Sequence, residues 1–358
     1  MSLETQIDQK IGEVRTEALD LSFGEIANLH ENKELIIQPE YQRLFRWSVE
    51  QKSRLVESIL LELPIPQIFV IENANGVYEL IDGLQRISTV LQFFDSRVLS
   101  LDPLTLSGCD IIKDLNGKKF EDLPLSLRLR IKRSSLRTIV IKRQSKSFLR
   151  YEMFKRLNTG GSILSPQEIR NCSSRMLGEG GAEFYAFLQD LTNHPSFKLT
   201  TSTISEVDAD QKGDEELVLR FFAAKNYQDG YRGNIRDWLD EYMESILLKR
   251  LDFNLDSERG DFCDLFDLVS DKLGVTAFVK FRGAAPVGGL APAYYEAITI
   301  GCFQERDLLR QRDADTVKRK LNTLVQGSEF RSVTGPGANN RTKLLKRIAL
   351  VATAIREA

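Results

Sequence analysis

The sequence predicts an α+β protein in two parts: a mixed domain of strands and helices over residues 1–175 and an all-helical domain over residues 176–358. One observation is that strand patterns, short apolar runs bounded by turn residues, fade after about residue 178. A second is that apolar residues beyond that point recur at helical spacing. The third is length, because 358 residues are ample for two domains.

The composition is that of a soluble globular protein, with 42% apolar and 28% charged residues. No run of about 18 apolar residues occurs, so we expect no membrane span. The polar N-terminus, with Glu4 and Asp8, argues against a secretory signal. The four cysteines form no Cys-x-x-Cys pair, which favours reduced thiols in the cytoplasm over disulfides or a zinc cluster.

The first domain begins with an extended segment over 35–41. Ser48 then has the character of a helix N-cap, and Gln51 completes a capping-box pattern. We therefore expect a helix over 49–61.

A hairpin follows, with strands over 67–72 and 77–81 on either side of the turn sequence 73–76. The second strand runs directly into Asp82-Gly83, where a helix begins. Its expected apolar stripe consists of Ile87, Val90, Leu91 and Phe94.

The remaining elements follow from the same signals. In the first domain we expect a helix over 123–133, a strand over 137–143, a helix over 151–157 ended by the glycines that follow, and a helix opened by Ser165, Pro166 and Glu168. In the second we expect helices over 215–226, 234–249, 261–273, 292–303, 305–325 and 341–355. The polar stretch 200–213 reads as a linker or mobile loop.

The sequence lacks the residues that several classes of enzyme need for catalysis. There is no Gly-x-x-x-x-Gly-Lys-Ser/Thr loop, which excludes a P-loop NTPase, and there is no His-Glu-x-x-His zinc motif. The two histidines, His30 and His194, are far apart in the sequence, so a nuclease centre that depends on several histidines cannot be assembled. A Ser-His-Asp triad would have to use one of these two residues.

The turn from Asp82 to Arg86 is the candidate active site. Gly83 lets the main chain approach a ligand closely, and the first-turn amides of Leu84, Gln85 and Arg86 form a ready anion site. The Arg86 guanidinium suits a two-pronged phosphate contact, and Asp82 suits a magnesium ion or a positioned water. The alternative is that Asp82 is an N-cap and Arg86 a surface ion-pair partner.

A second candidate cluster is Tyr41-Gln42-Arg43 with Arg46 and Trp47. These side chains suit stacking and hydrogen bonding to a base, or neutralisation of phosphate charge. The alternative is an aromatic pair packed on the sheet beside exposed arginines.

A third cluster is Asn158-Thr159-Gly160-Gly161. Its amides suit a phosphate-binding nest, and the alternative is a plain helix C-cap.

A basic stretch runs from Leu125 to Arg150, with nine lysines or arginines and no acidic residue, although the whole chain has a net charge of −2. It is either a phosphate-contacting surface or a solvated face. If it contacts DNA, we expect the contacts from Arg128, Arg130, Lys132, Arg133 and Arg137.

A second basic segment lies near the C-terminus, where the glycine-containing segment 334–340 precedes Arg341, Lys343, Lys346 and Arg347. It suits contact with a partner or nucleic acid, or is a loop that caps a basic last helix.

The motifs occur in one order along residues 20–245. They are Tyr41-Gln42-Arg43 and Trp47, Ser58-Ile59-Leu60, Pro64-Ile65-Pro66, Ile81 to Arg86, Phe154 to Gly161, Leu164 to Arg170, and Asp214 to Leu217 with Arg220-Phe221-Phe222. This set resembles the N-terminal domain of the GmrSD-type restriction endonucleases, which has a ParB/sulfiredoxin-like core. The resemblance implies prokaryotic defence against foreign DNA, and some family members sense modified DNA.

The resemblance also implies binding and hydrolysis of nucleoside triphosphates, for which the family needs an Asp-Gly-Gln-Gln-Arg segment. Asp82, Gly83, Gln85 and Arg86 match it. The Tyr41-Gln42-Arg43 motif also matches the family. From the resemblance and the residue chemistry together, we expect catalysis by Asp82, Gln85 and Arg86, with Mg²⁺ on Asp82. We expect nucleotide binding by Gly83, Leu84, Arg86, Tyr41, Gln42, Arg43, Arg46, Asn158, Gly160 and Gly161.

Two features depart from the family pattern. Leu84 stands where the family usually has glutamine, so hydrolysis is slow if that glutamine positions the attacking water. The helical part lacks the histidine-metal nuclease domain to which many relatives are fused, so cleavage would come from a separately encoded partner. A homodimer through the helical domain is also open.

Three functions remain. The first is an NTP-hydrolysing subunit of a restriction-type defence system that engages DNA or a partner nuclease. The second is a non-enzymatic module that binds DNA or neutralises a nuclease. The third is a magnesium-dependent endonuclease in its own right.

Overall fold

The computed structural model describes residues 2–4, 15–37, 47–73, 75–99, 101–145, 152–153, 156, 165–175, 177, 179–335 and 337–358. The chain divides into two compact units, residues 1–163 and 164–358. Among the described residues, no helix is long and apolar enough to cross a membrane.

The first unit is built on a mixed five-stranded sheet in the order β1-β5-β3-β4-β2. Its strands are β1 (Thr16–Ser22), β2 (Leu35–Ile36), β3 (Ile68–Glu72), β4 (Tyr78–Asp82) and β5 (Ser135–Ile141). The pairs β1–β5 and β3–β4 are antiparallel, whereas β3–β5 and β2–β4 are parallel. The α+β fold expected from the sequence is confirmed.

Strands β3 and β4 form the expected hairpin. Asn73 donates its amide to the Val77 carbonyl at 2.8 Å, and Gly76 takes the left-handed backbone conformation at φ 80°. A register shift between Phe69 and Val70 lies opposite the last residues of β4, so the ladder is irregular where that strand ends.

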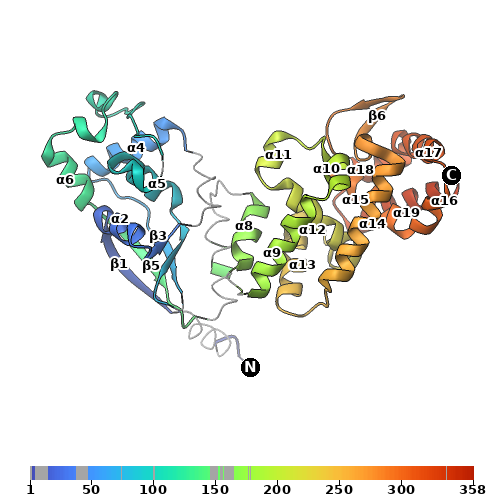
Figure 1. Cartoon of the computed structure of the whole chain (residues 1–358), viewed down its shortest axis with the longest axis horizontal. Helices are drawn as coiled ribbons and strands as arrows, with labels where there is room; N and C mark the ends of the chain where they lie inside the picture. Colours follow the sequence, from blue (N-terminus) through green and yellow to red (C-terminus); the bar gives the residue numbers. More distant parts are fainter. Residues whose placement is uncertain are drawn as a thin grey trace. The chain divides into compact units, whose positions relative to one another are not determined.

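Four helices pack on one another beside this sheet: α2 (Phe23–Glu31), α4 (Val49–Leu60), α5 (Leu84–Phe94) and α6 (Leu125–Arg133) (Figure 1). Helix α4 begins with the expected capping box between Ser48 and Gln51. The 3₁₀ turns Ser96–Leu99, Lys113–Leu115 and Phe120–Asp122 lie between α5 and α6 in the sequence.

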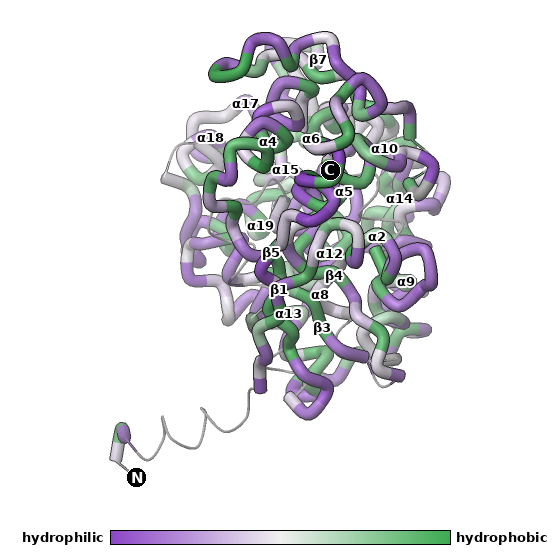
Figure 2. Tube along the Cα trace, turned by 90° about the vertical axis from the view of Figure 1, so that its left-hand side faces the viewer, coloured by the Kyte–Doolittle hydropathy of each residue, from purple (hydrophilic) through white to green (hydrophobic). Residues whose placement is uncertain are grey.

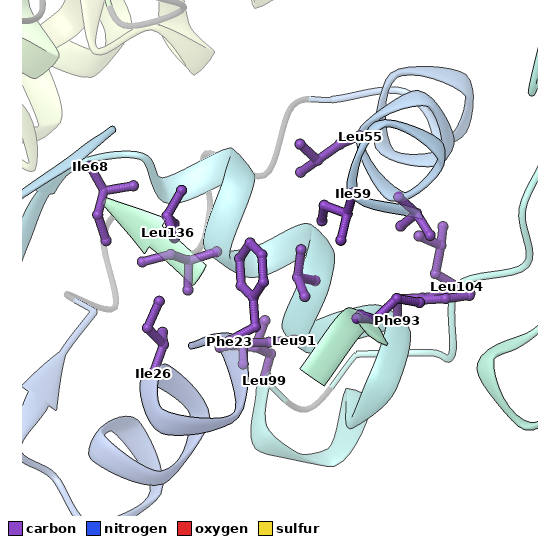
Figure 3. Close-up of a cluster of buried hydrophobic side chains, with 14 of the residues drawn as sticks. Phe23, Ile26, Leu55, Ile59, Ile68, Leu91, Phe93, Leu99, Leu104 and Leu136 are labelled. Carbon is purple, nitrogen blue, oxygen red and sulfur yellow. The ribbon is translucent and has the colours of Figure 1, made fainter. Parts of the chain in front are cut away.

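One face of the sheet and the inner faces of these helices form the core of the first unit. Val70, Leu80 and Val140 of the sheet belong to the same buried cluster as Ile87 and Leu91 of α5. Figure 3 shows Phe23 of α2 in this cluster next to Leu91. Burial of these large side chains contributes about 1.5–3 kcal/mol each before the loss of chain entropy is counted.

The second unit is mostly helical. Its helices are α8 (Pro166–Arg175), α9 (Glu179–Thr192), α10 (Pro195–Thr201), α11 (Glu206–Asp210), α12 (Gly213–Asn226), α13 (Ile235–Leu247), α14 (Leu255–Leu273), α15 (Pro292–Gln304), α16 (Arg306–Gln311), α17 (Ala314–Gln326), α18 (Ser328–Thr334) and α19 (Arg341–Arg356). Short 3₁₀ turns occupy Gln228–Gly230 and Gly274–Thr276. Hydrophobic and hydrophilic residues alternate along the trace, as helices packed on one side require (Figure 2).

Phenylalanines fill much of the core of the second unit. Phe221 and Phe222 of α12 contact Phe262 of α14, and the rings of Phe262 and Phe266 lie 4.4 Å apart. Aromatic pairs of this kind add about 0.5–1.5 kcal/mol beyond their burial.

Three local expectations for this unit were wrong. The stretch 200–213 contains α11, because the Ser205 side chain caps its first turn by accepting from the Asp208 amide. The expected helix over 305–325 is two helices, and Asp313 caps the second by accepting from the Thr316 amide. The unit also contains a small antiparallel hairpin, β6 (Lys280–Arg282) with β7 (Ala285–Val287).

Candidate functional site

The turn between β4 and α5 depends on Gly83. This residue is buried and has φ 103°, a left-handed conformation that strains any residue with a side chain. A Cβ atom here would lie 2.2 Å from Cγ2 of Ile68. The turn therefore packs its main chain directly against strand β3.

No side chain caps α5, because its N-cap residue is Gly83 itself. The first intrahelical bond runs from the Ile87 amide to the Gly83 carbonyl at 3.0 Å. The amides of residues 84–86 precede that bond, and the helix dipole gives them a partial positive charge. This is the geometry in which helix N-termini bind phosphate groups.

Arg86 is held in place across this turn. Its Nη2 donates to Asp82 Oδ2 at 2.6 Å and to the Gln67 carbonyl at 3.1 Å. Its side chain is 17% exposed, and its Nε is buried without a hydrogen-bond partner among the described residues. Nη2 is thus fixed by Asp82 and by the residue that precedes β3, and the buried Nε–H has no acceptor among the described residues.

Asp82 and Arg86 are four residues apart and form an ion pair. The ion pair agrees with one half of the alternative interpretation, in which Arg86 is an ion-pair partner. The other half was wrong, because the N-cap of α5 is Gly83 and no side chain caps this helix. The Asp82 side chain is still 32% exposed, so its carboxylate also faces solvent.

Gln85 links the turn to Trp47. Its Oε1 accepts from the Trp47 backbone amide at 3.3 Å. Trp47 directly follows the segment that contains Tyr41, Gln42 and Arg43. Gln85 therefore fixes the chain where that motif ends, a contact between two motifs that are about 40 residues apart in the sequence.

Leu84 packs against the hydrophobic core of the first unit and is partly buried. It lies among apolar side chains, where a glutamine amide would need hydrogen-bond partners to replace those it has in water.

Several candidate residues lie outside the described part of the chain. They are Tyr41, Gln42, Arg43 and Arg46 of the second motif and Asn158, Gly160 and Gly161 of the third.

No group of three or more His, Cys, Asp or Glu side chains with the geometry of a metal site occurs among the described residues. Asp82 is the acidic residue at the turn. Mg²⁺ bound with a nucleotide commonly uses one or two protein carboxylates and completes its shell with phosphate oxygens and water. A single carboxylate at this position fits that mode of binding.

In the basic stretch, some of the five candidate side chains are held by contacts within the protein and others are exposed. Arg130 donates to the Leu60 carbonyl at 3.1 Å, and the Lys132 ammonium lies 5.5 Å from the ring centre of Phe94. Arg128 is half-buried, whereas Arg133 is exposed. Arg137 is exposed on β5 opposite Asp20 of β1. Arg133 and Arg137 are thus the most available of the five candidates.

A buried network of charges, which sequence reasoning missed, runs through the second unit. Arg170 of α8 bonds Asp240 at 2.7 Å and Glu216 at 3.1 Å. Glu216 also bonds Arg220, which bonds Glu296 at 2.8 Å. Glu296 in turn bonds Arg347 of α19. Three arginines and three acids alternate along this network.

Burial and charge act in opposite directions on this network. Burial alone would raise the pKa of Glu216, but the charges and hydrogen bonds of Arg220 and Arg170 outweigh it and hold that pKa below its usual value. Burial alone would lower the pKa of Arg220, and Glu216 and Glu296 raise it instead. Arg170, Glu216 and Arg220 belong to the motif set, and their contacts here are structural.

Residues 24–174 match the family model described as the GmrSD restriction endonuclease, N-terminal domain. The matched range includes the hairpin, the Gly83 turn, α5 and the basic stretch. Searches of curated proteins and of solved structures each gave no significant match.

Proposed function

Because residues 24–174 match the model of the GmrSD restriction endonuclease N-terminal domain, we propose that this chain is a nucleotide-binding, NTP-hydrolysing subunit of a restriction-type prokaryotic defence system. The phosphates would bind at the turn between β4 and α5. The observation that carries this proposal is the glycine turn, which puts uncapped helix amides and the Arg86 guanidinium at one point.

The proposed binding step exchanges the partners of Asp82 and Arg86. In their mutual ion pair, 2.6 Å long, each charge is already neutralised. A bound Mg²⁺ would neutralise phosphate charge, and Asp82 would hold it. Arg86 would then direct its guanidinium, including Nε, at phosphate oxygens while Gln67 keeps its position. The first-turn amides of α5 would donate hydrogen bonds to exposed phosphate oxygens.

Gln85 acts in this proposal as a positioning residue. Its Oε1 accepts from the amide of Trp47, the residue that follows Tyr41–Arg46 in the sequence. Binding at the site would then depend on both motifs at once.

The test is nucleotide binding and phosphate release with ATP, GTP, CTP and UTP in magnesium, with and without DNA. Asp82→Ala and Arg86→Ala should each lower affinity by at least about tenfold, since each removes a charge-assisted contact. The matched control is Arg97→Ala, which removes an arginine that also pairs with an aspartate, Asp95, but at the far end of α5. Absence of binding and release in the wild type, or equal loss in the control, contradicts the proposal.

We also propose that Arg133 and Arg137 contact DNA backbone phosphates. Arg133→Glu and Arg137→Glu should weaken salt-sensitive binding to duplex DNA. Arg130→Glu, where the wild-type side chain already bonds Leu60, should weaken it less. Equal DNA affinity in all variants would show that the basic stretch 125–150 is only a solvated face.

A non-enzymatic partner module is the second candidate function. Two observations favour it: Leu84 packs against the core, and Asp82 is already paired with Arg86. Stable co-purification with the product of an adjacent gene, together with nucleotide binding that gives no phosphate release, would select this function. Robust turnover by the isolated chain would reject it.

A further inference from the structure

A second concave surface lies in the helical unit, beside the β6–β7 hairpin. The cavity has a volume of about 370 Å³, within the size range of small-ligand sites. Figure 1 shows the hairpin at the edge of the unit that contains α15, α17 and α18. Its lining comprises Lys280, Phe281, Arg282, Val287, Tyr294, Val325, Arg331, Thr334 and Gly335.

The charges of this cavity are all of one sign. Lys280, Arg282 and Arg331 are exposed at its wall, and no lining residue is acidic. Among the described residues, the side chains of these three have no hydrogen-bond or ion-pair partner, although their backbones pair within β6–β7 and α18. Three cations that converge without a counter-charge repel one another, and a bound anion relieves that repulsion.

The floor of the cavity is apolar. Tyr294 and Val325 are buried below it, and Phe281 is half-buried. Val287 is 42% exposed at the wall, so apolar surface remains open to a ligand. An inorganic anion has no apolar surface to bury against these side chains, whereas a base or a sugar does.

The hairpin that carries two of the cations is fixed to the helical unit. Gly283, at φ 62° in its turn, donates to Gln326 Oε1 at 2.7 Å and accepts from Gln326 Nε2 at 3.0 Å. Gln326 also bonds the Asn322 carbonyl within α17. Lys280 and Arg282 are therefore presented from an anchored backbone, which reduces the entropy lost on binding.

We propose that this cavity binds a nucleoside phosphate, either free or as one unit of a nucleic-acid strand. The three cations would bind the phosphate, and the apolar lining of Phe281, Val287 and Val325 would contact the base or sugar. The cavity also includes Thr334 and Gly335, the start of the glycine segment that precedes the basic last helix. This site lies in the helical unit and is separate from the nucleotide site proposed at the Gly83 turn.

The test uses fluorescence anisotropy of a fluorescein-labelled, 5′-phosphorylated hexathymidylate at low salt. Arg282→Glu and Arg331→Glu should each weaken binding by about tenfold and lower the dependence of affinity on salt. The control is Arg250→Glu, which reverses an exposed arginine elsewhere in the same unit. Phe281→Leu keeps the floor apolar but removes the ring, and it should weaken binding by about threefold through lost stacking.

Competition identifies the source of the ligand. Displacement by thymidine monophosphate indicates a free nucleotide, whereas displacement by unlabelled hexathymidylate alone indicates a strand. Displacement by inorganic phosphate at the same concentration as thymidine monophosphate overturns the proposal, as does an equal loss in Arg250→Glu or no loss in Arg282→Glu and Arg331→Glu. The probe titration contains neither a nucleoside triphosphate nor magnesium, so failure here is distinguishable from failure of the proposed NTP site.

Discussion

Gly83 meets two separate demands, a left-handed backbone and contact with Ile68. Gly83→Ala should lower the free energy of unfolding by about 3 kcal/mol, because the backbone strain and the clash add. It should also abolish nucleotide binding by displacing the first turn of α5. Calorimetry and nucleotide titration measure the two effects.

Gly76 provides the matched control, because it is also left-handed, at φ 80°, but a Cβ there would have no neighbour within 4 Å. Gly76→Ala should cost only the strain, about 1 kcal/mol, and retain binding. Equal losses in the two variants would mean that contact with Ile68 has no consequence.

Leu84 is partly buried, and its side chain packs against the core of the first unit. Leu84→Gln should lower stability by about 1–2 kcal/mol through lost apolar burial. Phosphate release should stay within about threefold of the wild type, since a change of this size is under 1 kcal/mol in the barrier. An increase of about tenfold or more at unchanged stability would show that a glutamine here positions water.

At the scale of elements, the capping box of α4 was predicted correctly. The Ser48 side chain accepts from the Gln51 amide at 3.3 Å, and the Ser48 amide donates to Gln51 Oε1 at 3.0 Å. Ser48→Ala should lower the free energy of unfolding by about 1 kcal/mol. Ser58→Ala, inside the same helix and with its hydroxyl bonded to the Arg54 carbonyl, should cost less, and a larger loss there would contradict the cap assignment.

Local signals explain which elements were predictable. The β3–β4 hairpin, α5 and the start of α8 depend on turn, cap and periodicity patterns that a few neighbouring residues define. The pairing of β3 with β5 in parallel, and of β5 with β1, joins segments far apart in the sequence, which no local pattern specifies. The β6–β7 hairpin was missed because its strands have three residues each.

The candidate site also has features that a local sequence pattern predicts and features that depend on tertiary contacts. Asp82, Gly83 and Arg86 could be named as candidates from the sequence because they lie within five residues and the chemistry of the turn is local. The contact from Gln85 to Trp47 and the anchoring of Arg86 by the Gln67 carbonyl are tertiary, so the sequence did not reveal them. The charged residues near Glu216 were noticed as a motif, but their burial depends on five helices packing together.

At the scale of the whole helical unit, the buried network makes α8, α12, α13, α15 and α19 depend on one another. Glu296 lies between Arg220 and Arg347 and is 1% exposed. Glu296→Gln leaves buried positive charge uncompensated and should lower the free energy of unfolding by about 3–5 kcal/mol. Glu357→Gln, which breaks an exposed pair with Lys320, should cost at most about 1 kcal/mol by the same denaturation measurement.

The same network sets how the stability of this unit varies with pH. In the folded state the pKa of Glu216 lies below its ordinary value of 4.5, so the unfolded chain binds this proton more tightly. The stabilisation is therefore complete above about pH 6 and is lost as pH falls from 4.5 through the lower folded pKa. The stability difference between wild type and Glu216→Gln should be largest at neutral pH and shrink below pH 4.5.

The measurement uses tryptophan fluorescence. In a Trp47→Phe background the one remaining tryptophan, Trp238, lies in the core of this unit and reports its unfolding. A difference that stays constant from pH 7 to pH 3 would mean that folding does not shift the pKa of Glu216, and a difference that grows as pH falls through 4.5 would mean that burial outweighs the arginines and raises that pKa.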